Sequence, residues 1–171
     1  NTRIILEPKI IGTVIGIQYF NGTVNKAINE NNQDITESVR SLKNIPNRIA
    51  IKNKIEIRGV LYEDENKSNK NVGTKFIKIE NFKPTLSRLR FCAFQIFHCN
   101  INHFQSLQEL KQLNFEIPQT QFTNFISDID IYLQCWKEGK LFKNYPTSGI
   151  VLKINSRKFQ KYLGENKQSI H

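Results

Sequence analysis

The strongest constraint on the fold is a β-hairpin signal near the start of the chain. The dipeptide Asn21-Gly22 separates two runs rich in β-branched residues, Ile10–Phe20 and Thr23–Ile28. An Asn-Gly pair closes a tight turn between antiparallel strands, because both residues tolerate positive φ. Lys54–Tyr62 and Arg88–Phe97 also have the composition of strands. We therefore expect antiparallel sheets, with the aromatic segment 88–97 at the centre of one of them.

Three stretches have helical features. Asp34 and Glu37 have the spacing of a capping box ahead of a short helix, and a second helix is expected to start at Ser106. The longest helix is expected from Phe122 to about Lys140, where apolar residues recur near a 3.6-residue period. Strands and helices mix without strict strand–helix–strand alternation, which favours an α+β architecture with antiparallel sheets.

Size and charge narrow the class of partner. The 171 residues suit one domain, and the net charge is +10. Clustered Lys and Arg favour a polyanion such as nucleic acid, because they release counterions from phosphates. An AT-rich genome would produce the same excess of Lys, Asn and Ile, so composition leaves both explanations open. The sequence has no run of roughly 18 apolar residues, and no membrane span is expected.

Sulfur-containing residues and histidines give weaker signals. The three cysteines form no CxxC pair, which favours a reducing compartment such as the cytosol or an organelle matrix. Methionine is absent, so we expect a processed chain or a fragment of a larger protein. His98, Cys99 and His103 lie close together and near Cys92, but their spacing fits no common zinc pattern. We therefore predict a structural role for them and no metal site.

Two lysines accompany apolar strands. Lys9 follows the first strand-like segment, and Lys153 lies near the end of the last one, Gly149–Ile154. A lysine beside apolar strands can lose basicity by desolvation and become a nucleophile. An ordinary exposed lysine, whose aliphatic stem packs on apolar surface, also suits these positions. Taken by themselves, the residues favour this second interpretation.

Seven motifs, in the same order and over nearly the whole chain, resemble the adenylation (nucleotidyltransferase) domain of NAD-dependent DNA ligases. They are Glu7-Pro8-Lys9-Ile10-Ile11-Gly12 for EPK(I/L)DG, Tyr19-Phe20-Asn21-Gly22 for YxNG, a shortened ATRGDG…IP stretch from Lys26 to Pro46, Ile55–Gly59 for LEVRG, Arg88–Phe94 for RxLxFFAYG, Tyr145–Asn155 for YEIDGVVVKVN after Trp136, and Tyr162-Leu163-Gly164. Each match is weak alone. Their common order is what carries the resemblance.

The resemblance implies the fold of ligase and mRNA-capping nucleotidyltransferases, with antiparallel sheets packed with helices around a central cleft. It also implies a reaction in which a lysine attacks the α-phosphate of NAD, expels nicotinamide mononucleotide and carries AMP to the 5′-phosphate of a DNA nick. By matching position, Lys9 would accept AMP and Glu7 would read the adenine edge. Lys153 would neutralise the phosphate, and Arg58 would support its strand.

Three positions depart from the family at acids that hold the ribose and a divalent cation. Ile11 replaces the Asp of KxDG, Val60 the Glu of RGE, and Ser148 the Asp of DGVVVK. One such loss would reduce the rate about 10²-fold or more. The resemblance therefore implies an impaired enzyme that still binds a nucleotide such as NAD or AMP, with Mg²⁺ required only if the enzyme is active.

Three functional interpretations follow from these departures. The first is a single adenylation-like domain, residues 1–171, that is catalytically impaired but binds a nucleotide or nucleic acid in DNA nick joining. The second is an active, divergent NAD-dependent ligase fragment in which Glu56, Glu63 or Asp64 replaces the lost acids. The third is a non-catalytic subunit of a larger assembly. In all three, we expect no upstream nicotinamide-binding domain and no downstream OB-fold, zinc or helix-hairpin-helix domain. The first interpretation requires Lys9 and Lys153 to share one hollow.

Overall fold

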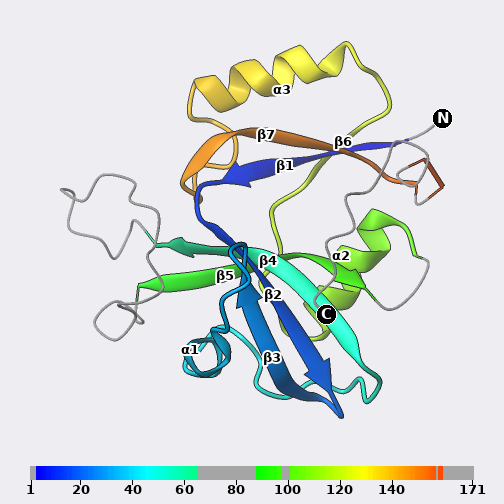
Figure 1. Cartoon of the computed structure of the whole chain (residues 1–171). Coiled ribbons are helices and arrows are strands. Elements are labelled where there is room, and N and C mark those ends of the chain that lie inside the picture. Colours follow the sequence, from blue (N-terminus) through cyan, green and yellow to red (C-terminus); the bar gives the residue numbers. More distant parts are fainter. Residues whose placement is uncertain (1–2, 65–87, 98–100, 157, 160–171) are drawn as a thin grey trace.

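Two antiparallel sheets form the framework of the domain (Figure 1). The computed structural model describes residues 3–64, 88–97, 101–156 and 158–159. In chain order the elements are β1 (Ile4–Ile10), β2 (Thr13–Phe20), β3 (Thr23–Asn29), α1 (Thr36–Arg40), β4 (Ile55–Glu63), β5 (Leu89–Phe97), α2 (His103–Gln112), β6 (Gln121–Thr123), α3 (Asp128–Lys137) and β7 (Thr147–Ile154). The smaller sheet has the order β6-β1-β7, and the larger one β3-β2-β4-β5. The predicted α+β class with antiparallel sheets is confirmed.

The hairpin at Asn21-Gly22 joins β2 and β3 as predicted. Both turn residues have positive φ, 51° at Asn21 and 76° at Gly22. A Cβ at Gly22 would also lie 2.5 Å from the carbonyl oxygen of Ile49, so glycine is the residue that fits there. The strand predicted over 10–20 is in fact interrupted, because β1 ends at Ile10 and β2 begins at Thr13.

The main core covers one face of the larger sheet. Alternate residues of its strands point to this face, as the two-residue period of a strand requires. These residues, none more than 2% exposed, are Ile15, Ile17, Tyr19, Ile55, Ile57, Leu61, Phe91 and Ala93. Side chains from α1, α2 and the segment that follows α1 complete the same cluster.

The other face of the larger sheet lies against the smaller sheet. β1 and β7 run above β4 and β5 (Figure 1), and the ring of Tyr62 on β4 lies 6.2 Å from that of Tyr145, which precedes β7. The helix α3 covers the outer side of the smaller sheet, where the indole of Trp136 donates a hydrogen bond to the hydroxyl of Thr147 at 2.8 Å. The space between the two sheets is therefore bordered by β1, β7, β4 and β5.

The predicted helices differ in extent from the observed ones. The helix predicted from Phe122 begins only at Asp128, because Phe122 belongs to β6. The predicted capping box at Asp34 is absent, since the residue preceding α1 is Ile35 and makes no side-chain cap. The capping box of α2 is instead formed by Asn102 and Gln105.

The segment 88–97 forms β5 at an edge of the larger sheet as described, and the prediction that it lies at the centre is wrong. Of its three aromatic residues, Phe91 lies in the main core, whereas Phe94 and Phe97 are half-buried. None of the described helices is long and apolar enough to cross a membrane.

Candidate functional site

A buried carboxylate lies between the two sheets. Glu7 on β1 is 3% exposed, and its Oε2 accepts an ion-paired hydrogen bond from Nζ of Lys153 on β7 at 2.8 Å. Its Oε1 contacts Nε2 of His103, the first residue of α2. Burial alone would raise the pKa of Glu7, but the hydrogen bond from His103 and the charge of Lys153 hold that pKa below its ordinary value of 4.5.

Lys153 also contacts an aromatic ring of the opposite sheet. Its Nζ lies 5.0 Å from the centroid of Phe94 on β5, within the range of a cation–π interaction. Lys153 is thus held by a carboxylate from the smaller sheet and a ring from the larger one, and its side chain remains 23% exposed. A carboxylate, an ammonium group and an aromatic face meet at this point between the sheets.

Lys9 lies on the same strand as Glu7, two residues further on. By the two-residue alternation, Ile5, Glu7 and Lys9 fall on one face of β1, although the register shifts between Pro8 and Ile10. Lys153 on β7 falls on the same face, because its direct partner is Ile5. A Cβ placed on Gly149 of β7 would lie 3.9 Å from Cδ of Lys9. Lys9 itself is exposed and has no ion-pair partner among the described residues. The two lysines predicted to share one site therefore lie on one face of two adjacent strands.

The turn after Lys9 is held from two sides. The backbone N–H of Ile11 donates to the carbonyl of Pro146 at 2.7 Å. A Cβ on Gly12 would collide with the carbonyl of Leu61 and would lie 2.7 Å from Cγ1 of Val60. The lysine-bearing turn therefore rests directly on β4, and glycine at position 12 is what permits this approach.

Three residues stand where the ligase family has acids: Ile11 in this turn, Val60 on β4 and Ser148 on β7. Val60 contacts the backbone at Gly12, as described, and its cross-strand partners are Val14 and Cys92. Ile11 is 38% exposed, so it does not fill the space between the sheets. Ser148 is exposed on β7. Among these three, only the hydroxyl of Ser148 could offer a ligand atom to a metal ion, and neutral hydroxyls alone are a poor donor set for Mg²⁺.

Arg58 on β4 makes its side-chain contacts within the larger sheet. Its Nε donates to Oε1 of Glu56 at 2.6 Å, and its guanidinium lies 4.8 Å from the ring centroid of Phe97. These contacts join β4 to β5 within the larger sheet. The structure thus brings Glu7 and Lys153 into contact, and the ion pair of Arg58 is with Glu56 on its own strand. The predicted role of Arg58 in supporting its strand stays a prediction.

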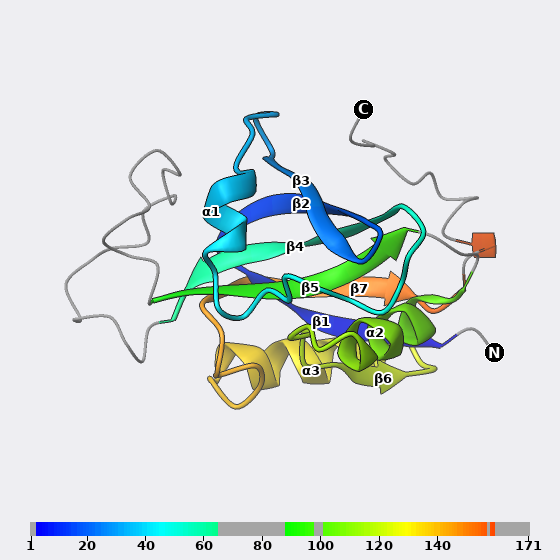
Figure 2. The ribbon, with the colours of Figure 1, turned by 90° about the horizontal axis from the view of Figure 1, so that it is seen from below.

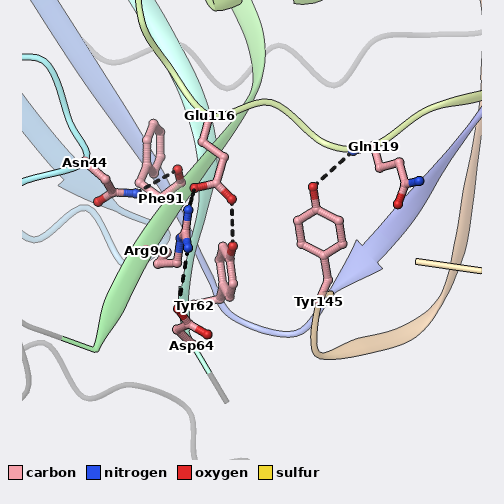
Figure 3. A network of polar contacts seen from close by, with 8 residues as sticks. All are labelled: Asn44, Tyr62, Asp64, Arg90, Phe91, Glu116, Gln119 and Tyr145. Carbon is pink, nitrogen blue, oxygen red and sulfur yellow. Dashed lines mark hydrogen bonds and ion pairs between the residues drawn. The ribbon is translucent and has the colours of Figure 1, made fainter. Parts of the chain in front are cut away.

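A second polar network joins β4, β5 and the segment that follows α2 (Figure 3). Glu116 accepts hydrogen bonds from the hydroxyl of Tyr62 at 2.9 Å and from the guanidinium of Arg90 at 2.7 Å, and Arg90 also reaches Asp64 at 3.5 Å. Burial and the adjacent carboxylate of Glu116 raise the pKa of Tyr62. Because Glu116 lies in the segment that leads from α2 to β6, this network ties the connection between the sheets to β4 and β5.

Sequence reasoning missed two members of the site. His103 was assigned to a structural cluster with His98 and Cys99, which lie outside the described residues, and its contact with Glu7 was not foreseen. Phe94 was placed only in a motif match. No group of three or more His, Cys, Asp or Glu side chains suited to a metal ion occurs within the described ranges. No sequence signal links either residue to Glu7, because His103 and Phe94 lie far from it in the chain.

Comparisons with known proteins show what this chain is similar to. No protein-family model matches the chain. The DNA ligase of Metamycoplasma arthritidis is 30% identical over 196 residues, which cover 97% of this chain and 29% of that protein. The ligase domain of LigD from M. tuberculosis superposes with a TM-score of 0.59 at 12% identity, covering 90% of this chain and 49% of that one. An archaeal ATP-dependent RNA ligase gives a TM-score of 0.58 at 14% identity, over 92% and 41% of the two chains.

The chain has the fold of a ligase nucleotidyltransferase domain. This confirms the predicted fold type, and the sequence similarity supports the predicted relation to DNA ligases. The chain spans 29% of the length of the Metamycoplasma relative. The similarity to this ligase therefore concerns one nucleotidyltransferase domain within a longer protein.

Proposed function

We propose that this domain is an adenylation domain of the NAD-dependent DNA ligase type, which binds the adenosine part of a nucleotide between its sheets and is impaired in AMP transfer. The observation that carries the proposal is the meeting of Glu7, Lys153 and Phe94 on the inner face of β1, β7 and β5. The assignment to the NAD-dependent type rests on the order of the motifs around Lys9.

The three groups suit the edge and face of adenine. Adenine presents an amino donor at N6 next to an acceptor at N1, so a carboxylate and an ammonium group side by side complement this edge. Glu7 would accept from N6, and Lys153 would donate to N1. The ring of Phe94 would stack on the base. The contact with Glu7 leads us to assign Lys153 to the base rather than to the phosphate.

Lys9 would act at the phosphate end of the same site. Its Nζ, once deprotonated, would attack the α-phosphorus, the bond from phosphorus to the bridging oxygen would break, and nicotinamide mononucleotide would leave. The product is a phosphoramidate that holds AMP on Lys9. Ile11, Val60 and Ser148 provide no carboxylate at this end, so charge that develops on the phosphate would lack the acid-held metal ion. The substitutions therefore support slow transfer of AMP.

The interpretation as a fully active enzyme has less support. The three acids considered as substitutes each face a basic partner: Glu56 pairs with Arg58 at 2.6 Å, Asp64 with Arg90 at 3.5 Å, and Glu63 lies 4.0 Å from Arg88. Glu56 lies four positions from Val60, which is roughly 13 Å along a strand. Of these three, Glu63 is the acid nearest to the turn that follows Lys9, since it lies two residues beyond Leu61, the partner of Thr13, but it lies beside Arg88.

Intact-mass spectrometry can test the impairment. The chain and its triple variant I11D/V60E/S148D would each be incubated with Mg²⁺ and either NAD or ATP. We expect an AMP adduct on the triple variant, at a rate at least about 10²-fold higher than on the unaltered chain. The variant Lys9→Arg in the triple background should carry no adduct, because the guanidinium is not a nucleophile at neutral pH. Rapid, complete adduct formation on the unaltered chain would contradict the impairment.

The interpretation as a non-catalytic subunit is favoured by one observation, the apolar contact of Val60 against Gly12 at the phosphate end. Binding assays with nicked and intact duplex DNA separate it from the adenylation domain. A preference for the nicked duplex supports a domain that serves nick joining. Equal binding of both duplexes, without any affinity for AMP, supports the subunit.

A further inference from the structure

His103 is a buried histidine that has no part in the proposed transfer of AMP. Its Nε2 contacts Oε1 of Glu7, and both side chains are buried. The other oxygen of that carboxylate, Oε2, is bound by Nζ of Lys153 at 2.8 Å. The carboxylate that we assign to the base of a nucleotide is therefore held at both oxygens, by residues from two different elements.

The backbone around His103 fixes its place in the fold. His103 is the first residue of α2, whose N-terminus is capped by the side chain of Asn102. The N–H of Phe104 donates to Oδ1 of Asn155, which directly follows β7, at 2.9 Å. Figure 2 shows α2 beside β1 and the end of β7, and the helix packs on β5, the strand that carries Phe94. The imidazole is thus carried by a helix end that is itself tied to the smaller sheet.

Two contacts restrain a carboxylate more than one contact does. The terminal torsion of a Glu side chain has broad preferences, so a carboxylate with a single partner can still turn about it. Lys153 holds Glu7 through a long, flexible stem, and its side chain is 23% exposed. The imidazole of His103 is a rigid ring, and its side chain is only 7% exposed. The buried ring is therefore better suited than Lys153 to fix the plane of the Glu7 carboxylate.

The same contact favours the ionised form of Glu7. Burial raises the pKa of Glu7, and the hydrogen bond from His103 is the strongest of the influences that lower this pKa again, ahead of the charge of Lys153. An ionised carboxylate can only accept hydrogen bonds, so Nε2 of His103 is the donor. An imidazole carries a proton at Nε2 both as the cation and as one neutral tautomer. His103 can therefore hold Glu7 as an acceptor in either charge state.

This restraint bears on the choice between two purine bases. Adenine has a donor at N6 and an acceptor at N1, whereas guanine has an acceptor at O6 and a donor at N1. A carboxylate fixed opposite N6, with the ammonium of Lys153 opposite N1, matches adenine and opposes guanine. If the carboxylate of Glu7 could turn, it could accept from N1 of guanine while Lys153 donated to O6. Selectivity for adenine therefore needs Glu7 to stay in place.

We propose that His103 is a positioning residue that sets the preference of this site for adenine over guanine, by fixing Glu7 as the acceptor for N6. The inference rests on the proposed function, because it requires a base bound at Glu7 and Lys153. His103 acts through Glu7 and donates no bond to the base. Its loss should therefore reduce the discrimination between bases more than it weakens the binding of AMP.

Calorimetric titration of three variants with AMP and with GMP tests this role. In His103→Gln the amide nitrogen lies as many bonds from Cα as Nε2 of the imidazole does, so a donor still reaches Glu7. His103→Asn carries the same amide one bond closer to the backbone, which withdraws the donor. Ser106→Ala is the control for a disturbance of α2 alone, since Ser106 is buried on this helix and its hydroxyl accepts from the N–H of Ile96 at 3.4 Å.

The expected results concern the ratio of the two affinities. The unaltered chain should bind AMP at least about 10-fold more tightly than GMP. His103→Gln should keep this ratio within about twofold, and Ser106→Ala should keep it as well. His103→Asn should lower the ratio at least about fivefold. Thermal unfolding of each variant shows whether it is folded. If His103→Asn is not, His103→Leu removes the donor and replaces it in the comparison.

Two kinds of result would overturn the role of His103. An unchanged ratio in the folded variant without the donor would show that His103 does not control the choice of base. A loss of the ratio in His103→Gln or Ser106→Ala as large as in His103→Asn would show that His103 only stabilises the fold. Failure of the proposed function is distinct, because the unaltered chain would then bind AMP and GMP equally or bind neither.

Discussion

The two ends of the proposed nucleotide site are built very differently. At the base end, the buried carboxylate of Glu7 has a charged partner in Lys153 and a second contact in His103. At the phosphate end, the exposed Lys9 is followed by a turn whose neighbours are apolar or neutral, with Val60 against Gly12. A buried charge needs its partners to keep the protein folded, whereas no carboxylate is buried at the turn with Ile11 and Val60. The comparison leads us to propose that nucleotide binding and AMP transfer can be lost separately in one site.

The largest expected effect is a loss of folding stability when the base end is altered. Glu7→Ala would leave Lys153 and His103 next to a cavity without their carboxylate, and it should lower the free energy of unfolding by about 3 kcal/mol or more. Urea denaturation measures this change. Ser148→Ala at the phosphate end is the control and should change the free energy by less than about 0.5 kcal/mol. Comparable losses in the two variants would remove the distinction between the ends.

The next largest effect on stability is expected at the phosphate end, where Gly12 packs closely on β4. In Gly12→Ala the added Cβ would meet the carbonyl of Leu61 and the side chain of Val60, which should cost about 1–3 kcal/mol of stability. Because the first of these contacts is with backbone, Val60→Ala should not restore stability to the double variant. Urea denaturation of the single and double variants measures both effects. Full rescue by Val60→Ala would show that the turn does not rest on the β4 backbone.

A smaller effect is expected for the network in Figure 3. Tyr62→Phe removes the hydrogen bond to Glu116 at 2.9 Å and should lower the free energy of unfolding by about 1 kcal/mol. Glu116 keeps its contacts with Arg90, which limits the loss. Tyr132→Phe is a matched control, because the hydroxyl of Tyr132 makes only a long contact of 3.4 Å with the carbonyl of Phe122. An equal loss in both variants would contradict a specific role for the network.

The smallest expected effect is on the pH dependence of folding stability. The folded state holds the pKa of Glu7 below 4.5, so below that pH the unfolded state binds more protons at this residue. Its contribution to stability is therefore present above pH 4.5 and is lost as the pH falls through the pKa of the folded state. Thermal unfolding across this range should show a shallower acid dependence in Glu7→Gln than in the unaltered chain. Identical acid dependence would show that Glu7 is not held as an anion.

Much of the fold could be predicted because its signals are local. The Asn21-Gly22 turn fixes the pairing of β2 with β3 by its own backbone preference. The start of the long helix was predicted wrongly. Apolar residues continue at helical spacing back to Phe122, but local hydrogen bonds between β6 and α3 outweigh that pattern. The hydroxyl of Thr123 accepts from the N–H of Phe125 at 3.0 Å and donates to Asp128. Such bonds offer the backbone an alternative to a helix, and Phe125 is left 65% exposed.

The site could be predicted only in part, for a related reason. Glu7 and Lys9 were found because they are close in sequence, within one motif. The contacts of Glu7 with Lys153 and His103 join residues far apart in the chain, and no spacing rule reveals them. α2 packs on β5, so the contact of its first residue with Glu7 on β1 depends on how the two sheets pack. The motifs could therefore supply Glu7, Lys9 and Lys153 as participants but not the contacts that hold Glu7.

The central claim is that Glu7, Lys153 and Phe94 form a site for adenine, and calorimetric titration of the chain with AMP and with GMP tests it most directly. Guanine has an acceptor at O6 and a donor at N1, the reverse of adenine. We predict that AMP binds at least about 10-fold more tightly than GMP, and that Phe94→Ala weakens AMP binding while the exposed Leu152→Ala does not. Equal affinities for AMP and GMP would contradict the claim.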